Sequence, residues 1–350
     1  MTTVAVLGAG IMATALTFPL AENGHDVRLV GTHLDRDIID SIQRTGRHPD
    51  LDLVVNENVR AYQLEDAAEA FADAEVAMSG VNSFGVRWAG EQFASLLRPG
   101  MKVLSITKGM EADEQGNLAI LPNVLHECVG PDLVNACTWT AIVGPSIAGE
   151  VAVHHDTCVV FCGEDGDANE FLANLFRTDY YHVWTSTDFI GHEVGAAVKN
   201  IYAFAAGFGA GLLDKEGKTG DRYVRYNYGA AVFAQGQKEL RQFVELLGGV
   251  PTTADGLGGV GDMFVTSMGG RNVMAGRYVG SGVPFSDVRD SLMKGVTLEG
   301  VNAIRVIGGA LEPLTERGII KPTDFPLCRY LYDVIEHDAP LDMPWDRFFV

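Results

Sequence analysis

The N-terminal stretch up to Val30 places the strictest constraint on the fold. A β-branched run at 4–7 breaks into Gly8-Ala9-Gly10-Ile11-Met12-Ala13, and an amphipathic stretch then continues to Asn23-Gly24. A second β-branched run follows at 27–30. Strand, G-x-G-x-x-A turn, helix and strand in this order, within about thirty residues, are typical of a βαβ unit that binds a dinucleotide. The sequence therefore predicts an N-terminal domain of the Rossmann type.

Each small residue of this turn has its own expected role. Gly8 allows the tight turn, Gly10 lets the backbone approach a pyrophosphate, and Ala13 keeps the helix close to the strand. The N-terminus of the helix adds N–H donors and a positive dipole end. Pro19 lies inside the helical pattern, and we expect it to kink the helix.

The residues after the second strand leave the choice of dinucleotide open. The acidic residue that usually binds the adenosine ribose is missing, because Gly31-Thr32-His33 stands at that point. His33 and Arg36 favour tolerance of a 2′-phosphate, whereas Asp35 argues for the unphosphorylated ribose. Both NAD and NADP are therefore retained as cofactors.

Strand and helix patterns alternate as far as Val183, after which the strand pattern stops. This alternation is typical of a doubly wound sheet, and we predict an α/β domain of this kind over 1–188. An all-α domain is expected over 189–350, with helical patterns at 193–211, 223–247, 257–268, 285–293, 298–317 and 323–336.

The segment Glu193–Gly211 is apolar on every side, which is typical of a helix buried all round. Lys199 and Asn200 stand in its middle. A buried ammonium needs an anionic partner, although a lysine can also extend its charged end to solvent from a helix end. The apolar stretch Ile201–Leu213 is shorter than the roughly 20 residues of a membrane span, so no span is expected.

Two loops of the first half carry candidate anion contacts. Lys108-Gly109 follows the strand pattern at 102–107, at the sheet edge where ligands bind in parallel sheets, although a surface lysine would look the same. Gly144-Pro145-Ser146 follows another strand pattern, and we expect Ser146 near the N-cap of the next helix.

The second half contains a further polar constellation. Asp262 and Thr266 are four residues apart and so share one face of a helix. The turn Gly269-Gly270-Arg271-Asn272 follows, and its guanidinium and exposed backbone N–H groups suit a phosphate or a carboxylate. A plain surface turn would have the same composition.

Charge and cysteine content narrow the class of partner. The formal net charge of −20 repels phosphate backbones, so nucleic acid and anionic membranes are not expected partners. Five cysteines show no disulfide framework, which indicates a reducing, cytoplasmic compartment. The adjacent His154 and His155 lack a third ligand at a metal spacing, so no metal site is expected.

Taken together, these motifs resemble those of the NAD(P)-dependent glycerol-3-phosphate dehydrogenases, a group related to 6-phosphogluconate dehydrogenase. The resemblance covers essentially 4–310. It implies a cytoplasmic homodimer that interconverts sn-glycerol 3-phosphate and dihydroxyacetone phosphate. The motifs that carry it are Gly8–Ala13, Lys108-Gly109, Gly144–Ala148, Val198-Lys199-Asn200, Gly261-Asp262 with Thr266 and Gly270-Arg271-Asn272, and Thr297–Gly300.

The resemblance also implies roles for single residues. Lys199 would be the proton donor and acceptor at the substrate hydroxyl, and we expect Asp262 to hold and orient it. The implied substrate-binding residues are Lys108, Gly144, Ser146, Asn200, Thr266, Gly270, Arg271 and Asn272. The implied cofactor-binding residues are Gly8, Gly10, Ile11, Met12, Ala13, His33, Phe84, Lys108, Ala148, Arg271 and Glu299.

Two departures from the family pattern keep other substrates open. Gln235 replaces an arginine, and a charged insertion brings Tyr223, Tyr226 and Tyr228; the last residues, 342–350, match no part of the pattern. Another phosphorylated ketose or polyol, such as a tetritol phosphate, is therefore an alternative. A 2-hydroxyacid or ketopantoate-type reductase would be a more distant one, and a dinucleotide sensor would be non-catalytic.

Overall fold

The computed structural model describes residues 1–218 and 225–350. Its contacts form two compact units, one of residues 1–108 with 121–189 and one of residues 109–120 with 190–350. Residues 109–120 form an antiparallel hairpin of β8 (Met110–Ala112) and β9 (Leu118–Ile120). The sequence assigned this hairpin to the domain 1–188, whereas its contacts group it with the second unit.

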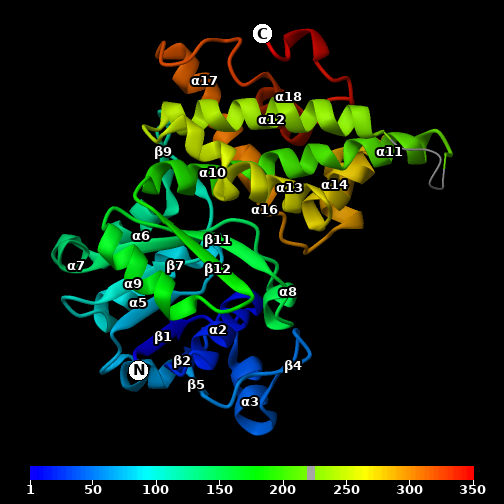
Figure 1. Ribbon diagram of the computed structural model, residues 1–350. Helices are drawn as coiled ribbons and strands as arrows, with labels where there is room; N and C mark the ends of the chain where they lie inside the picture. Colours follow the sequence, from blue (N-terminus) through cyan, green and yellow to red (C-terminus); the bar gives the residue numbers. More distant parts are fainter. Residues whose placement is uncertain (219–224) are drawn as a thin grey trace. The chain divides into compact units, whose positions relative to one another are not determined.

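Unit 1 is built on one sheet, which has eight strands among the described residues, in the order β12-β11-β10-β7-β6-β1-β2-β5 (Figure 1). Neighbouring strands are parallel except β10 and β11. The chain leaves β1 toward β2 and β5 on one side and then returns to β6 and β7 on the other, so the strand order reverses beside β1. The strands are β1 (Thr3–Leu7), β2 (Asp26–Val30), β5 (Val59–Tyr62), β6 (Val76–Ser79), β7 (Lys102–Ser105), β10 (Thr138–Val143), β11 (Thr157–Cys162) and β12 (Tyr181–Ser186).

Apolar cores cover both faces of this sheet. Alternate residues of β1 point to opposite faces: Val4 and Val6 join one buried cluster, and Ala5 and Leu7 join the other. This arrangement confirms the predicted doubly wound α/β class. The helices of the unit are α1 (Ile11–Ala15), α2 (Thr17–Glu22), α3 (Arg36–Thr45), α4 (Ala67–Phe71), α5 (Val86–Leu96), α6 (Leu121–Val129), α7 (Pro131–Ala136), α8 (Ala148–Ala152) and α9 (Gly166–Phe176); β3 (Arg47–His48) and β4 (Leu53–Val54) form a small hairpin.

The predicted kink in the first helix is confirmed. The helical stretch is divided into α1 and α2, with Leu16 between them. Pro19 has no N–H to donate to the carbonyl of Ala15, and its ring crowds that carbonyl. The interruption therefore falls one turn before the proline.

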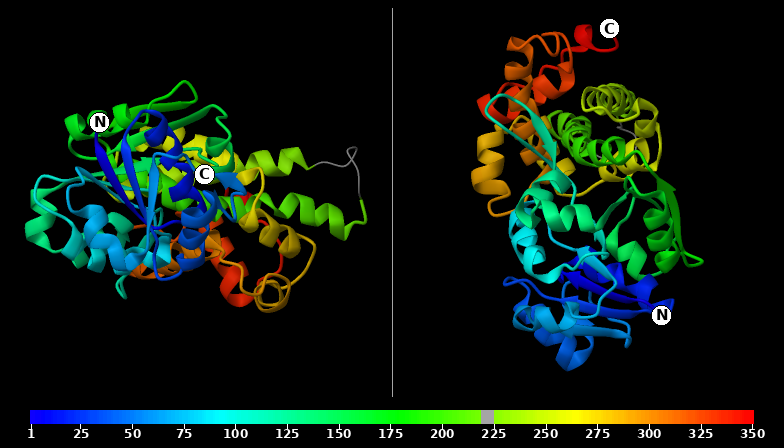
Figure 2. Two further views of the ribbon diagram at one scale, coloured as in Figure 1. Left: turned by 90° about the horizontal axis from the view of Figure 1, so that it is seen from below. Right: turned by 90° about the vertical axis from the view of Figure 1, so that its left-hand side faces the viewer.

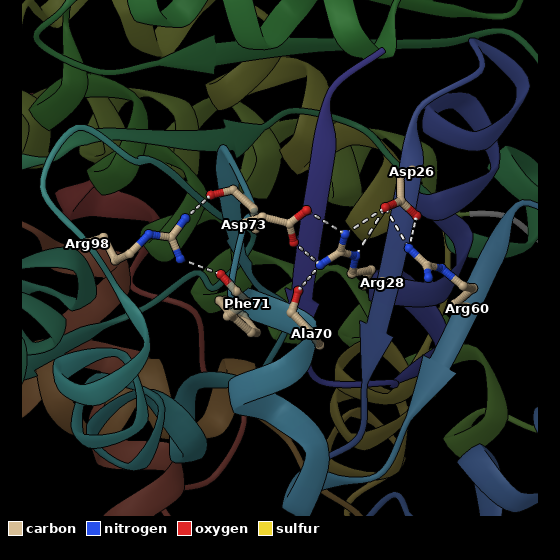
Figure 3. Close-up of polar contacts among 8 residues, drawn as sticks. Asp26, Arg28, Arg60, Ala70, Phe71, Asp73 and Arg98 are labelled. Carbon is tan, nitrogen blue, oxygen red and sulfur yellow. Dashed lines mark hydrogen bonds and ion pairs between the residues drawn. The ribbon is translucent and has the colours of Figure 1, made fainter.

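An arginine network lies where β2 begins (Figure 3). Arg28 is only 8% exposed, and its guanidinium donates to Asp26 Oδ2 (2.9 Å from Nη2), to the Ala70 carbonyl (3.1 Å) and to Asp73. Arg60 donates to both oxygens of Asp26 at 2.7 Å. Burial alone would raise the pKa of Asp26, but the hydrogen bonds from Arg60 and Arg28 outweigh it and hold that pKa below its ordinary value.

We expect the substitution Arg28→Met to lower the free energy of unfolding by about 1–3 kcal/mol, because it leaves the Ala70 carbonyl and Asp26 short of a donor. The matched variant Arg60→Met removes a side chain that is 55% exposed, and it should cost less than about 1 kcal/mol. Urea denaturation measures both. Because the pKa of Asp26 is depressed in the fold, its stabilisation is complete above the ordinary value of about 4 and is lost as the pH falls through the folded value. If the difference in the free energy of unfolding between wild type and Arg28→Met stayed constant below pH ~4, the depressed pKa of Asp26 would be contradicted.

In its described residues, unit 2 is helical apart from the β8–β9 hairpin, which confirms the predicted helical C-terminal domain. The helical patterns at 257–268, 285–293 and 298–317 each contain a π-helical turn, at 257–261, 288–292 and 304–308. The α-helices are α10 (Phe189–Ala206), α11 (Phe208–Lys215), α12 (Tyr226–Leu246), α13 (Asp262–Ser267), α14 (Arg271–Gly280), α15 (Phe285–Asp287), α16 (Glu299–Ala303), α17 (Gly309–Glu316) and α18 (Pro326–His337).

Glycines bring α10 and α11 into backbone contact with α14. A Cβ placed on Gly276 would lie 1.8 Å from the carbonyl oxygen of Phe204, and one on Gly207 would lie 2.0 Å from that of Val273. Gly211 and Gly280 form the same kind of contact farther along. The helix that carries Lys199 is therefore fixed against the helix that carries Arg271 and Asn272. Figure 2 shows α12 alongside α10 and α11 as well.

Together α10 and α11 form one stretch, Phe189–Lys215, that is long and apolar enough to cross a membrane by length and composition. It is longer than the apolar run read from the sequence, so length does not exclude a span. However, 78% of its most apolar window is buried inside the structure. This is the environment of a core helix, as the all-round apolar pattern predicted.

Gln235 lies within a buried polar network of unit 2. Its Nε2 donates to Glu239 Oε1 at 2.8 Å, and its Oε1 accepts from the backbone N–H of Phe349 at 3.0 Å. Glu239 also accepts from Tyr202 Oη on α10 and from the first-turn N–H groups of Leu327 and Cys328 in α18. Gln235 thus binds the backbone close to the C-terminal end, at Phe349.

Candidate active site

The glycine turn of unit 1 has room and donors for a dinucleotide. Gly8 adopts φ +112°, and a Cβ there would lie 2.9 Å from the backbone of Gly80. In contrast, no described atom lies within 4 Å of a Cβ placed on Gly10, so its face is open to an approaching ligand. Ala13 lies so close to Gly80 that a Cβ on Gly80 would be 2.6 Å from it. The small residues therefore fit a pyrophosphate at the start of α1.

Two side chains hold the peptide groups of this turn in place. Asp35 Oδ2 accepts from the N–H of Ala9 at 3.1 Å and from that of Thr32 at 2.9 Å. On the other side, fully buried His48 places Nε2 3.0 Å from the Ala9 carbonyl. His48 Nδ1 accepts from the backbone N–H groups of Asp50 and Leu51, so Nε2 is the donor to the Ala9 carbonyl. Sequence reasoning missed His48, which no motif marks.

We expect His48→Leu to raise the Kd for the dinucleotide about tenfold, which is about 1.4 kcal/mol, because Ala9 loses a donor. Turnover at saturating cofactor should stay within about twofold, since His48 acts only through the turn. The control is His126→Leu, which removes a half-buried imidazole whose ring centroid lies 4.3 Å from that of Trp139. Burial lowers the pKa of His126 to about 4, so its ring is neutral near pH 7. A Kd that rises equally in both variants would point to general destabilisation. Fluorescence titration with the reduced dinucleotide is the measurement.

The remaining cofactor candidates of unit 1 differ in their surroundings. His33 contacts Trp88 edge-on, with ring centroids 5.4 Å apart. Phe84 is 65% exposed and Ile11 43% exposed, whereas Met12 and Ala148 pack on the core. The two half-exposed apolar side chains are available to a ligand, and the two packed ones position the backbone.

Lys108 and Gly144 are brought together at the carboxyl ends of β7 and β10. Lys108 Nζ lies 3.4 Å from the Gly144 carbonyl, and Gly144 adopts φ +117°. Ser146 lies beside the N-cap of the following helix, as predicted, because α8 begins at Ala148 and its N-cap is Ile147. The extended backbone of Ile147 takes the capping position, and the Ser146 hydroxyl is buried.

The buried lysine of α10 has an anionic partner. Lys199 Nζ forms an ion pair with Asp262 Oδ1, and the two side chains are 8% and 4% exposed. Lys199 therefore does not extend to solvent. Removing both charges from water costs free energy that their attraction does not fully return, so the ion pair is a poor way to stabilise the fold. Its presence therefore favours a chemical role for Lys199 and Asp262.

The other candidates of unit 2 lie around this pair. Thr266 Oγ1 donates to the carbonyl of Asp262 at 2.7 Å, so the two residues do share a helical face. Gly270 adopts φ +97° and precedes α14, on whose first turn Arg271 is exposed and Asn272 is half-buried. Asn272 Oδ1 accepts from the N–H of Gly300 at 3.0 Å. A Cβ on Gly300 would lie 2.4 Å from the carbonyl of Asn200, so this turn also packs on α10. Glu299 begins α16 beside it.

The structure thus assembles two sets of candidates. In unit 1 it groups the glycine turn with Asp35 and His48, and Lys108 with Gly144. In unit 2 it groups Lys199 with Asp262 and Thr266, and Asn272 with Gly300 and Asn200. Tyr226 is 77% exposed, Tyr228 packs on Trp345, and Tyr223 lies outside the described residues.

Residues 1–218 and 225–350 contain no candidate metal site. In these residues, no group of three or more His, Cys, Asp or Glu side chains could hold a metal ion. His154 Nε2 pairs with Glu22 Oε1 at 2.9 Å, and its ring packs on Tyr180.

Comparison with known proteins places this chain in a family. The model of the NAD-dependent glycerol-3-phosphate dehydrogenase N-terminus matches residues 3–168, and that of the C-terminus matches residues 188–345. The chain is 33% identical over 338 residues to a glycerol-3-phosphate dehydrogenase [NAD(P)+] of Streptococcus pneumoniae, covering 96% of this chain and 92% of that one. It is 32% identical to an NADP(+)-dependent glycerol-3-phosphate dehydrogenase of Archaeoglobus fulgidus, over 83% of each chain.

Solved structures agree with this assignment. The glycerol-3-phosphate dehydrogenase of Coxiella burnetii superposes with a TM-score of 0.77 at 25% identity, covering 98% of this chain and 96% of that one. The enzyme of Plasmodium falciparum, at 18% identity, shares the fold with a TM-score of 0.82 over 100% and 95% of the two chains. The chain described here belongs to the NAD-dependent glycerol-3-phosphate dehydrogenase family.

Proposed function

We propose that this chain interconverts sn-glycerol 3-phosphate and dihydroxyacetone phosphate with NAD or NADP. The observation that carries the proposal is the buried ion pair of Lys199 and Asp262, supported by family membership. A dinucleotide sensor would need the glycine turn but not a desolvated proton donor, so the ion pair also argues against that alternative.

Lys199 has the chemistry required at the carbonyl of the substrate. When bound, the nicotinamide supplies the hydride, and the residues of the glycine turn would hold its pyrophosphate. Lys199 Nζ then gives a proton to the developing alkoxide, and in the reverse direction it takes the hydroxyl proton. Asp262 fixes the position of Nζ through the ion pair, and a preorganised charge of this kind stabilises the developing oxyanion without reorganisation.

The turn before α14 suits the phosphate of the substrate. Arg271 is exposed at the first position of the helix and can bind a phosphate through two parallel hydrogen bonds. Gly270 adopts a positive φ in this turn, and successive backbone N–H groups in turns can bind an anion. Binding energy from this remote group would orient the carbonyl for the hydride step.

A substrate panel tests this proposal. Oxidation of NADH and NADPH is measured with dihydroxyacetone phosphate, erythrulose 4-phosphate, ketopantoate and unphosphorylated dihydroxyacetone. We expect the highest kcat/KM with dihydroxyacetone phosphate. A higher value with the tetrulose phosphate would replace the substrate but keep the chemistry, and a preference for ketopantoate would assign the Arg271 turn to a carboxylate. Turnover of none of them would support the sensor.

We also propose a cytoplasmic homodimer. Free thiols at Cys128, Cys137, Cys158, Cys162 and Cys328 support a reducing compartment. Exposed apolar side chains in unit 2, among them Phe264 (57% exposed) and Met268 (72% exposed), support association with another surface. Sedimentation equilibrium at micromolar concentration tests the dimer, and a single species of 37.7 kDa would contradict it.

A further inference from the structure

An elongated apolar groove of about 740 Å³ lies in unit 2, between the α10–α11 stretch and the first half of α12 (Figure 1). One of its walls is formed by Tyr202, Ala206, Ala210 and Leu213. Their spacing places them on one face of the continuous stretch Phe189–Lys215. At about 1.5 Å per residue, these positions span about 16 Å. The groove is therefore long enough for an extended hydrocarbon chain.

Small residues leave this groove open. Gly229 and Ala230 line it from α12, and no described atom lies within 4 Å of a Cβ placed on Gly229. A further wall is α13, on which Phe264 is 57% and Met268 is 72% exposed. A hollow with apolar walls and a floor of glycine and alanine suits a ligand that buries methylene groups.

Polar groups gather at one end of the groove. A smaller cavity of about 360 Å³ is lined by Arg225, Tyr226, Asn227 and Tyr228, and it shares Arg225 and Tyr226 with the groove. Among the residues that the structure describes, buried Arg225 Nε and Tyr228 Oη have no hydrogen-bond partner. Burial raises the pKa of Tyr228, so its hydroxyl stays protonated. Because a buried donor without an acceptor is costly, these two donors point to a ligand that supplies one.

The charge at this end of the groove is positive. Glu216 is the shared partner of Arg225 and of Lys218, whose Nζ lies 2.8 Å from Glu216 Oε2, so two cations meet one carboxylate. The 21-residue helix α12 also begins here without a side-chain cap, and its dipole adds positive charge. In a chain with a net charge of −20, this local excess of positive charge favours an anion.

We propose that unit 2 binds an anionic amphiphile with a single alkyl chain. The chain lies in the groove, and its carboxylate or phosphate accepts from Arg225 and Tyr228. The residues that line this site include neither the glycine turn nor the Lys199–Asp262 pair, so the proposal does not depend on the reaction proposed above. A second copy of the chain could cover the outer side chains of α13, but a flat surface would not fill a groove with this floor.

Calorimetric titration of the full chain with simple amphiphiles tests the proposal. Affinity should rise about tenfold for each two methylenes added from octanoate to decanoate to laurate, because each buried methylene adds to the transfer free energy. Decanol, which lacks the charge, should bind at least tenfold more weakly than decanoate. Decyl phosphate is compared with decanoate. Either order of these two sustains the proposal and identifies the head group.

Two variants separate the chain from the head group. Gly229→Leu fills the groove and should weaken decanoate and decanol at least tenfold. Arg225→Gln should weaken decanoate at least fivefold and leave decanol within twofold. As controls, Ala234→Leu adds the same side chain at an exposed position of α12 that does not line the groove, and Arg289→Gln removes an arginine that is 48% exposed. Neither control should change the affinity.

The outcomes also separate this inference from the proposed function. Absence of binding, an affinity independent of chain length, or displacement of decanoate by the reduced dinucleotide or by glycerol 3-phosphate would overturn it. Sedimentation velocity covers the other occupant: if Gly229→Leu made the protein monomeric and wild type bound no decanoate, the groove would belong to a second copy. Decanoate binding that depends on both variants and persists beside dinucleotide and substrate would sustain the inference, even if glycerol 3-phosphate proved to be the wrong substrate.

Discussion

Lys199→Met should lower kcat about 10³-fold with dihydroxyacetone phosphate, because positioned proton transfer typically contributes 10²–10⁴-fold. Methionine keeps most of the volume of the buried lysine stem and removes only the ammonium. The Kd for the dinucleotide should change by less than about twofold, since the glycine turn that would bind it lies in unit 1 and Lys199 in unit 2. Single-turnover hydride transfer, followed by absorbance of the reduced nicotinamide, is the measurement.

Two further variants make this result interpretable. Lys199→Met leaves Asp262 buried without its cation, which can destabilise a protein by about 3–5 kcal/mol. The double variant Lys199→Met/Asp262→Asn removes the stranded charge, so it should regain stability but not turnover. Lys215→Met, at the exposed end of the same apolar stretch, should behave as wild type. Turnover above a tenth of wild type in Lys199→Met would exclude the proton-transfer role.

Gly276→Ala is expected to have the second large effect, through the geometry of unit 2. The new methyl group would lie 1.8 Å from the carbonyl oxygen of Phe204, so α14 must move away from α10. Overpacking of this kind costs about 1–3 kcal/mol, and more where backbone atoms are in contact. Because α10 carries Lys199 and α14 carries Arg271, we also expect kcat/KM for the phosphorylated substrate to fall by about 10²-fold, as a displacement of about 1 Å can cause.

A matched helical glycine provides the control. Gly229 lies in α12, and no described atom lies within 4 Å of a Cβ placed there. Gly229→Ala should therefore be neutral or stabilise the protein by up to about 1 kcal/mol. Thermal unfolding and steady-state kinetics are measured on both variants. Equal behaviour of the two would mean that the contact between α10 and α14 does not control the site.

The local motifs of the first unit were predictable because each has a steric cause within a few residues. Gly8, Gly10 and Ala13 mark a turn that few other residues can form, and Pro19 marks its own kink. In contrast, β5 was not predicted, because Val59–Tyr62 is a short edge strand with little apolar pattern. The strand pattern was also taken to stop at Val183, whereas β12 continues through the polar residues Thr185 and Ser186.

Long-range contacts could not be predicted from the sequence for a different reason. Nothing local connects His48 to the carbonyl of Ala9, or Gln235 to the N–H of Phe349, since the partners are 39 and 114 residues apart. The pairing of Lys199 with Asp262 was expected from resemblance and from the cost of an isolated buried charge. The helix start beside Ser146 was predictable, although the Gly-Pro-Ser pattern did not reveal that Ile147 is the N-cap.

The position of the β8–β9 hairpin has a consequence for how the protein can be divided. The chain passes between the two units at Lys108–Gly109, at Ile120–Leu121 and at Phe189–Ile190. A fragment cut after residue 188 would keep the hairpin but lose its partners, among them Arg317, which donates to the Gln115 carbonyl at 2.8 Å. Expression of the nucleotide-binding unit alone therefore calls for replacement of 109–120 by a short linker, and a single linear cut yields neither unit intact.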